Sequence, residues 1–192
     1  YAGPLTRGDP AFTEEALEGF CAEMASLGRV AGFFRLHPFI GVLQPSVGVV
    51  CERGETVSVD LAQDDEALWK QTASNVRNEI RKAGRAGVEV TFEPLCENLD
   101  LFISIYDETM RRLNASDDYF FSRDYYERLS EGLGEAMAVG IARDDTGLAL
   151  AASLFVVCGS TAQYHLAGST DAGRALNASK VILHEARAWA RS

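Results

Sequence analysis

The sequence is poor in the residues that build disulfide scaffolds and metal centres. Its 192 residues include four cysteines, none in a Cys-x-x-Cys pair, and three histidines far apart in the chain. Disulfide frameworks and zinc sites need such residues at close, regular spacings. We therefore expect reduced, mostly buried thiols and no metal site. The residues concerned are Cys21, Cys51, Cys96, Cys158, His37, His165 and His184.

The chain also lacks a long hydrophobic run, a signal peptide and a low-complexity linker. Its longest apolar run, Leu148–Cys158, has the length of a strand and falls well short of the roughly 20 residues that a membrane helix needs. The opening residues Tyr1–Leu5 contain no Met, so we expect the natural polypeptide to be longer. These features predict a cytoplasmic protein without a membrane span.

Positive charge is scarce. The chain has 28 acidic and 18 basic residues, a net charge of −10 and a pI near 4.8. This balance argues against a DNA-binding protein or a general nucleic-acid binder, but it leaves room for a local phosphate site. With 47% hydrophobic and 24% charged residues, the composition is that of an ordinary globular protein, and the length suits one large domain or two small lobes.

The scarce positive charges concentrate in the stretch Leu68–Val90. On a single helix that ends near Gly84 or Gly87, four cations fall within an arc of about 80°, next to an apolar stripe that faces a core. A row of cations in an acidic protein attracts phosphates, while a solvated basic face is the alternative reading. The four cations are Lys70, Arg77, Arg81 and Arg85.

The remaining pattern predicts alternating helices and strands. Helices are expected from Thr13 to Gly28, after the caps Asn98 and Ser122, and over Ala178–Arg191. Strands are expected at Val30–Leu36, Val47–Arg53, Thr56–Leu61, Val88–Phe92, Met137–Ala142, Leu148–Cys158 and Thr161–Ala167. We expect a break near Pro94–Glu97, which gives lobes over residues 1–94 and 95–192.

The order of elements in the second half resembles the first half of the GNAT acyltransferase fold. That order is helix, helix, three strands, loop and helix. In GNAT proteins the start of the last helix holds the pyrophosphate of an acyl-coenzyme A. The usual loop is Gln/Arg-x-x-Gly-x-Gly/Ala. The same register here, Arg174–Ser179, keeps the Arg and the small final residue but has Asn177 in place of the middle Gly.

Six short segments resemble the FemAB family of peptidyltransferases and their BioF2-like acetyltransferase relatives. They are Tyr1–Leu5, Phe34–Pro38, Thr56–Leu61, Arg77–Val88, Ile105–Met110 and Tyr164–Ser169. The resemblance implies an α/β (α+β) fold with two GNAT-like lobes, whose mixed, mostly antiparallel sheets are flanked by helices. The family continues past the final helix, so we expect this chain to be incomplete at both ends.

The resemblance implies transfer of an acyl or aminoacyl group to an amine by direct attack. The co-substrate would be acyl-coenzyme A or aminoacyl-tRNA, with no tightly bound cofactor. The acceptor would be a small molecule or a peptide, sugar or nucleotide-linked precursor. Two alternatives stay open: an ordinary acetyl-coenzyme A-dependent N-acetyltransferase, and a non-catalytic GNAT-like binding module. The sequence leaves the oligomeric state open.

Two residues are candidates for catalysis. Tyr164 and His165 lie on what we expect to be the central strand of the second lobe, and strand alternation points them to opposite faces. One of them then faces the cleft. His165 suits a general base because its ordinary pKa is near neutral. The alternative is a histidine of the core or the surface.

Further residues are candidates for binding phosphate or substrate. Arg174 and Lys180 flank the start of the last helix, and Arg35 lies at a strand end. Tyr119 belongs to the aromatic run Tyr119–Phe121 in a loop, where it suits stacking on a base or lining an acceptor channel. A surface ion pair for Arg35 and simple packing for the aromatic run are the alternatives.

Overall fold

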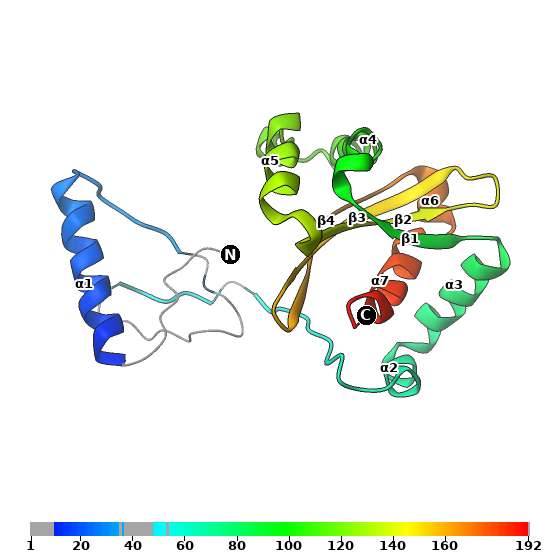
Figure 1. The fold of residues 1–192 in the computed structure, drawn as a ribbon, viewed down its shortest axis with the longest axis horizontal. Coiled ribbons are helices and arrows are strands. Elements are labelled where there is room, and N and C mark those ends of the chain that lie inside the picture. The colour runs from blue at the N-terminus through cyan, green and yellow to red at the C-terminus, as the bar shows by residue number, and fades with distance from the viewer. Residues whose placement is uncertain (1–9, 35, 37–47, 53, 192) are drawn as a thin grey trace. The chain divides into compact units, whose positions relative to one another are not determined.

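The computed structural model describes residues 10–34, 36, 48–52 and 54–191 (Figure 1). The chain divides into two compact units, Tyr1–Val59 and Asp60–Ser192. Arg35 and His37 lie outside the described residues, as do the two end residues of the strand expected at 47–53. Within the described ranges, no helix is long and apolar enough to cross a membrane.

The first unit contains helix α1, Pro10–Ser26. Thr13, expected as its cap, lies inside the helix and is buried. Gly28 follows with a positive φ of 69°, which a glycine adopts easily at a helix end. The described parts of the three strands expected before residue 62 are not strands, so those predictions are wrong. Their apolar composition is typical of strands, but a strand also needs a neighbour to accept its hydrogen bonds.

The second unit is built on an antiparallel sheet. Its strands are β1 (Glu89–Glu93), β2 (Met137–Arg143), β3 (Ala149–Cys158) and β4 (Thr161–Ser169), hydrogen-bonded in the order β1-β2-β3-β4. The turn between β2 and β3 is held by Asp144, whose carboxylate accepts from the backbone N–H groups of Thr146 and Leu148. The three strands and two hairpins predicted for this region are confirmed.

Helices cover both faces of this sheet (Figure 1). On one face lie α4 (Leu99–Arg112) and α5 (Arg123–Leu133), and on the other α7 (Ala178–Trp189) with α3 (Ser74–Arg85) packed against it. The short helices α2 (Asp65–Gln71) and α6 (Asp171–Ala175) and the 3-10 turns η1 (Leu95–Glu97), η2 (Asp117–Tyr119) and η3 (Gly134–Ala136) complete the unit.

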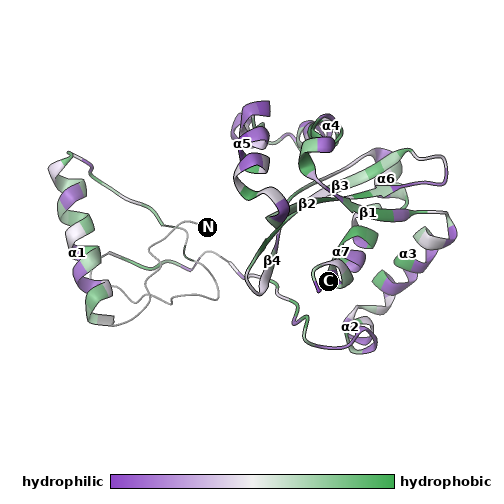
Figure 2. Ribbon diagram, in the orientation of Figure 1, coloured by the Kyte–Doolittle hydropathy of each residue, from purple (hydrophilic) through white to green (hydrophobic). Residues whose placement is uncertain are grey.

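Two hydrophobic cores lie on opposite sides of the sheet. One fills the space under α4 and α5 around Phe102, Tyr106 and Tyr126, and the other lies under α7 around Phe155 and Ile182. Figure 2 shows the hydrophobic residues gathered on β2 and β3 and the hydrophilic ones on α3 and α5. Both faces of β2 and β3 are therefore buried, which explains why they read as near-continuous apolar runs.

The prediction of a single basic helix over Leu68–Gly84 is wrong, because the helix is interrupted between α2 and α3. Thr72 has extended backbone angles, φ −67° and ψ 129°. Arg187 of α7 donates to the Thr72 hydroxyl at 2.9 Å, and Arg77 donates to the Thr72 carbonyl at 2.6 Å. Contacts distant in sequence thus hold the break, and Lys70 lies on a different helix from the three arginines.

The lobe boundary expected at 94/95 falls inside the second unit, between β1 and η1. Strand β1 pairs with β2 along its whole length, from Glu89 opposite Arg143 to Glu93 opposite Val139. The segment before residue 95 therefore contributes both a strand and helix α3 to the same layered structure.

The four cysteines are free and exposed. The prediction of mostly buried thiols is wrong: the residues occupy helix, loop and strand-end positions on the surface, such as Cys158 at the last position of β3.

Candidate functional site

Strand β4 carries a β-bulge at the position of the candidate catalytic residues. Leu154 of β3 lies opposite Leu166, whereas the next residue, Phe155, lies opposite Tyr164. His165 is thus an extra residue that the partner strand does not match, and bulges of this kind re-aim side chains next to active sites. In the described part of the chain β4 is an edge strand rather than the central strand expected.

His165 faces helix α5, where its Nε2 lies 3.1 Å from the hydroxyl oxygen of Tyr125. Burial lowers the pKa of His165, so the imidazole is neutral at pH 7. Burial raises the pKa of Tyr125, so its phenol stays protonated. The sequence analysis missed Tyr125, because nothing local links a helix residue to a strand 40 residues later.

Tyr164 points to the opposite face of the sheet, as strand alternation predicted. Its ring lies 5.6 Å from that of Phe155, which belongs to the core under α7. Burial raises the pKa of the Tyr164 phenol, although 45% of the residue remains exposed. Tyr164 and His165 therefore present two proton-bearing groups to the two sides of the same strand.

The start of α7 has the backbone geometry that a glycine usually provides. Asn177 precedes the helix with φ 56° and ψ 33°, in the left-handed region. Asparagine is one of the few residues that adopt this conformation readily. The departure from the usual loop sequence therefore preserves the backbone path.

The α7 N-terminus is also tied to the end of β4. The hydroxyls of Ser169 and Ser179 lie 2.5 Å apart, and no side chain caps the helix. Its first N–H groups lack intrahelical acceptors and carry the positive end of the helix dipole. This arrangement suits an anion.

The two cations predicted at this helix are engaged in ion pairs. Lys180 lies 2.5 Å from Glu79 of α3 and 3.0 Å from the side-chain oxygen of Asn177. Arg174 lies 3.2 Å from Asp171. Both pairs are partly exposed, so an incoming phosphate can compete for either cation at modest cost.

The basic row of α3 is partly used to hold α2. A single guanidinium nitrogen of Arg77 donates to the carbonyls of Trp69, Lys70 and Thr72 at 3.3, 3.0 and 2.6 Å. The guanidinium of Arg81 lies 5.2 Å from the centre of the Trp69 ring.

The two ends of the predicted row remain on the surface. Lys70 forms an exposed ion pair with Glu66 at 2.7 Å, and Arg85 is exposed at the end of α3. An exposed pair of this kind contributes little to stability, so these cations remain open to a phosphate.

Tyr119 lies on the turn η2 and is 55% exposed. Its neighbour Phe121 is the residue of that run that packs, because it stacks on Tyr125 with ring centroids 4.6 Å apart. Within the aromatic run, Phe121 therefore packs against α5, whereas Tyr119 is exposed and Phe120 is half-buried.

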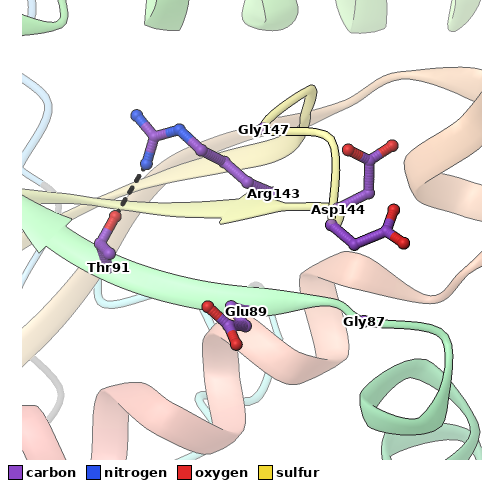
Figure 3. Close-up of a pocket in the computed structure, with 7 residues that line it drawn as sticks. Gly87, Glu89, Thr91, Arg143, Asp144 and Gly147 are labelled. Carbon is purple, nitrogen blue, oxygen red and sulfur yellow. Dashed lines mark hydrogen bonds between the residues drawn. The ribbon is translucent and has the colours of Figure 1, made fainter.

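A hollow of about 440 Å³ lies away from these residues, beside β1 and the β2–β3 turn (Figure 3). Figure 3 shows Arg143 hydrogen-bonded to Thr91, and Arg143 also pairs with Glu93 at 2.7 Å. None of the residues predicted for catalysis or binding lines this hollow. Its lining is Gly87, Glu89, Thr91, Arg143, Asp144, Asp145 and Gly147.

Comparison with known proteins gives a family match and a fold match. The family model described as acetyltransferase (GNAT) domain matches residues 70–192. The crystal structure of FemX superposes with a TM-score of 0.62 at 13% sequence identity, over 68% of this chain and 48% of the FemX chain. The chain thus spans about half the length of that structure, and at this identity the likeness shows the fold. None of the curated proteins matches the sequence.

Proposed function

This chain belongs to the family of acetyltransferase (GNAT) domains, and from that premise we propose that it transfers an acyl group from acyl-coenzyme A to an amine. The FemAB-like resemblance of the sequence is confirmed by the family match and the FemX-like fold. GNAT domains use acyl-coenzyme A as a co-substrate. The donor and the acceptor of this protein are part of the proposal.

The main support for the proposal is that the uncapped start of α7 contacts the end of the bulged strand β4, although the short helix α6 lies between them in sequence. Asn177 has left-handed backbone angles just before the helix, and the Ser179 hydroxyl in the first turn of α7 contacts the Ser169 hydroxyl at the end of β4. His165 lies four residues earlier on that strand, about 13 Å away at the usual rise per residue. An extended donor such as acyl-coenzyme A would thus place its anionic group at the start of α7 and its reacting group near the bulge.

The acceptor amine would approach from the α5 side, where His165 lies. The amine nitrogen attacks the thioester carbonyl, the C–N bond forms, the C–S bond breaks, and the thiolate leaves. A proton must be taken from the amine, and the neutral imidazole of His165 suits this role because burial keeps its pKa below the ordinary value. Tyr164, on the other side of β4, would line the donor side.

A second donor, aminoacyl-tRNA, is favoured by the resemblance to FemAB peptidyltransferases and by the cations exposed on α3. Arg81 and Arg85 lie one turn apart on that helix, and both are exposed. A tRNA donor makes many phosphate contacts, so its affinity falls steeply with salt, while coenzyme A is much less sensitive. Both donors are cytoplasmic, so we propose a cytoplasmic enzyme.

A thermal-shift screen tests the proposal. The full chain is heated with acetyl-coenzyme A, with a UDP-linked peptide precursor and with bulk aminoacyl-tRNA, each at low and moderate salt. We expect stabilisation by acetyl-coenzyme A that grows with its concentration and persists at moderate salt. If only the tRNA stabilises the chain, and that stabilisation is lost at moderate salt, the donor is aminoacyl-tRNA rather than acyl-coenzyme A. Binding of acetyl-coenzyme A without transfer to any amine in a panel would favour a non-catalytic binding module.

A further inference from the structure

The contact between Tyr125 of α5 and His165 of β4 joins the helical layer to the bulge. We propose that Tyr125 is a positioning residue that holds the His165 ring with its proton on Nε2 and leaves Nδ1 free to take a proton from the acceptor amine. This inference rests on the proposed function, because it assigns the partner of the proposed base. The two atoms in contact are the Tyr125 hydroxyl oxygen and His165 Nε2, 3.1 Å apart.

Tyr125 is itself held firmly by other rings. It stacks on Phe121 with centroids 4.6 Å apart and planes 22° apart. It also meets Tyr126 edge-on, with centroids 5.2 Å apart and planes 76° apart. Tyr126 is fully buried. A phenol clamped between two rings can fix the direction of a hydrogen bond to a neighbouring strand, which a mobile surface side chain cannot do.

In the proposed arrangement Nε2 donates to the Tyr125 oxygen in both protonation states, and the hydrogen bond is stronger when the ring is charged. A protonated imidazolium carries hydrogens on both nitrogens, so Nε2 can only donate to the phenol oxygen. The Tyr125 oxygen therefore stabilises the charged form of His165, which offsets part of the burial that disfavours it. When Nδ1 takes the proton of the attacking amine, the ring is already in the orientation that its charged form needs.

Few other charges act on this pair. Strands β3 and β4 carry no acidic or basic side chain besides His165. Four of the five charged residues of α5 are in ion pairs: Asp124 with Arg128, and Arg123 with Glu127 and with Asp100 of α4. The fifth, Glu131, is exposed near the end of the helix. On α4, Asp107 pairs with Arg111. Among the described residues, the phenol of Tyr125 is thus the polar group that contacts the His165 ring.

Nitrogen NMR of the imidazole tests this inference without any substrate. The full chain is labelled with ¹⁵N-histidine, and His165 is assigned by its loss in His165→Gln. We expect hydrogen on Nε2 in the neutral form, and a pKa of His165 that falls by roughly half a unit to one unit in Tyr125→Phe. The matched control is Tyr126→Phe, which removes a hydroxyl from the next residue of α5. That hydroxyl is buried and has no hydrogen-bond partner among the described residues.

Two results would overturn the inference: hydrogen on Nδ1 in the wild type, or the same pKa of His165 in Tyr125→Phe and the wild type. The pH profile of kcat/KM for transfer from acetyl-coenzyme A then connects the contact to catalysis. We expect its acidic limb to move to lower pH in Tyr125→Phe and to stay in place in Tyr126→Phe. If the limb stays in place in both while the NMR pKa moves, the ring is positioned but is not the base. If the wild type transfers no acyl group, the proposed function fails and the NMR result still decides whether Tyr125 orients the ring.

Discussion

Arg77 shows at the residue scale how a cation that suits a phosphate can serve the fold instead. One nitrogen of its guanidinium donates to carbonyls at the C-terminal end of α2, where the helix dipole is negative. Arg85, at the end of α3 in the same predicted row, remains exposed. Sequence spacing treats these two arginines alike, and only the break at Thr72 distinguishes them.

We expect Arg77→Ala to lower the free energy of unfolding by about 1.5–3 kcal/mol, because several carbonyls lose a charged donor. The matched control Arg85→Ala should change it by less than about 0.5 kcal/mol. Urea unfolding of both variants measures the difference. Equal stability of the two variants would show that Arg77 does not cap α2.

Glu93 gives a second prediction at this scale, on the pH dependence of stability. Its pKa lies below the ordinary value, chiefly because Arg143 hydrogen-bonds to the carboxylate and secondarily because Thr91 does. The unfolded chain therefore binds a proton more readily than the folded one, and the contribution is present above pH 4.5 and is lost as the pH falls through the folded pKa. We expect Glu93→Gln to cost about 1 kcal/mol or less at pH 7.

The effect of the same substitution should shrink as the pH falls through the lowered pKa of Glu93, because the wild-type carboxyl then takes up a proton. Unfolding of wild type and Glu93→Gln in urea across this range checks the prediction. A stability difference that stays constant between pH 7 and pH 2.5 would contradict an electrostatic origin.

At the scale of elements, α7 shows what local sequence can and cannot predict. The helix and the loop before it follow from a family pattern, and the helix is confirmed over Ala178–Trp189. In the sequence, Asn177 departs from the glycine that is usual at this position of the family pattern. In the structure, its backbone has the left-handed conformation that a glycine adopts easily.

Substitutions at Asn177 test this backbone requirement. We expect Asn177→Gly to keep the stability of the wild type within about 1 kcal/mol, since glycine adopts positive φ freely. Asn177→Val should lose about 1–2 kcal/mol more, because a β-branched side chain clashes in the left-handed region. Chemical denaturation distinguishes the two. If both variants lost the same stability, the lost contact with Lys180 would be the cause rather than the backbone.

Elements with local signals were predicted well, and those that depend on distant contacts were not. Ser122 caps α5 as expected, by accepting from the N–H of Tyr125. The two-part helix α2–α3 was missed because Arg187 of α7 helps to hold the break. The bulge at His165 was missed for the same reason, since a register shift belongs to a pair of strands rather than to one sequence.

At the scale of the whole molecule, the start of α7 places the positive end of a helix dipole in an acidic chain. The net charge is −10, and Lys180 and Arg174 are balanced by Glu79 and Asp171. The N–H groups at the start of α7 carry no counter-charge from a capping side chain. The order of helices and strands in this region was predicted from the sequence, and it is the feature that the sequence shares with the GNAT fold. In the structure this order places the start of α7 beside the end of the bulged strand β4. The pairing of Tyr125 with His165 needed the folded structure.

The most direct test of this account is a calorimetric titration of acetyl-coenzyme A into the wild type, Ser179→Asp and Ser122→Asp. An aspartate in the first turn of α7 suits the helix dipole and can accept from Ser169, so the fold should persist while phosphates are repelled. An aspartate at Ser122 adds the same charge as a normal cap of α5. We expect binding to the wild type and to Ser122→Asp, and at least roughly tenfold weaker binding to Ser179→Asp. Equal binding to the two variants, or none to the wild type, would contradict a donor site at the start of α7.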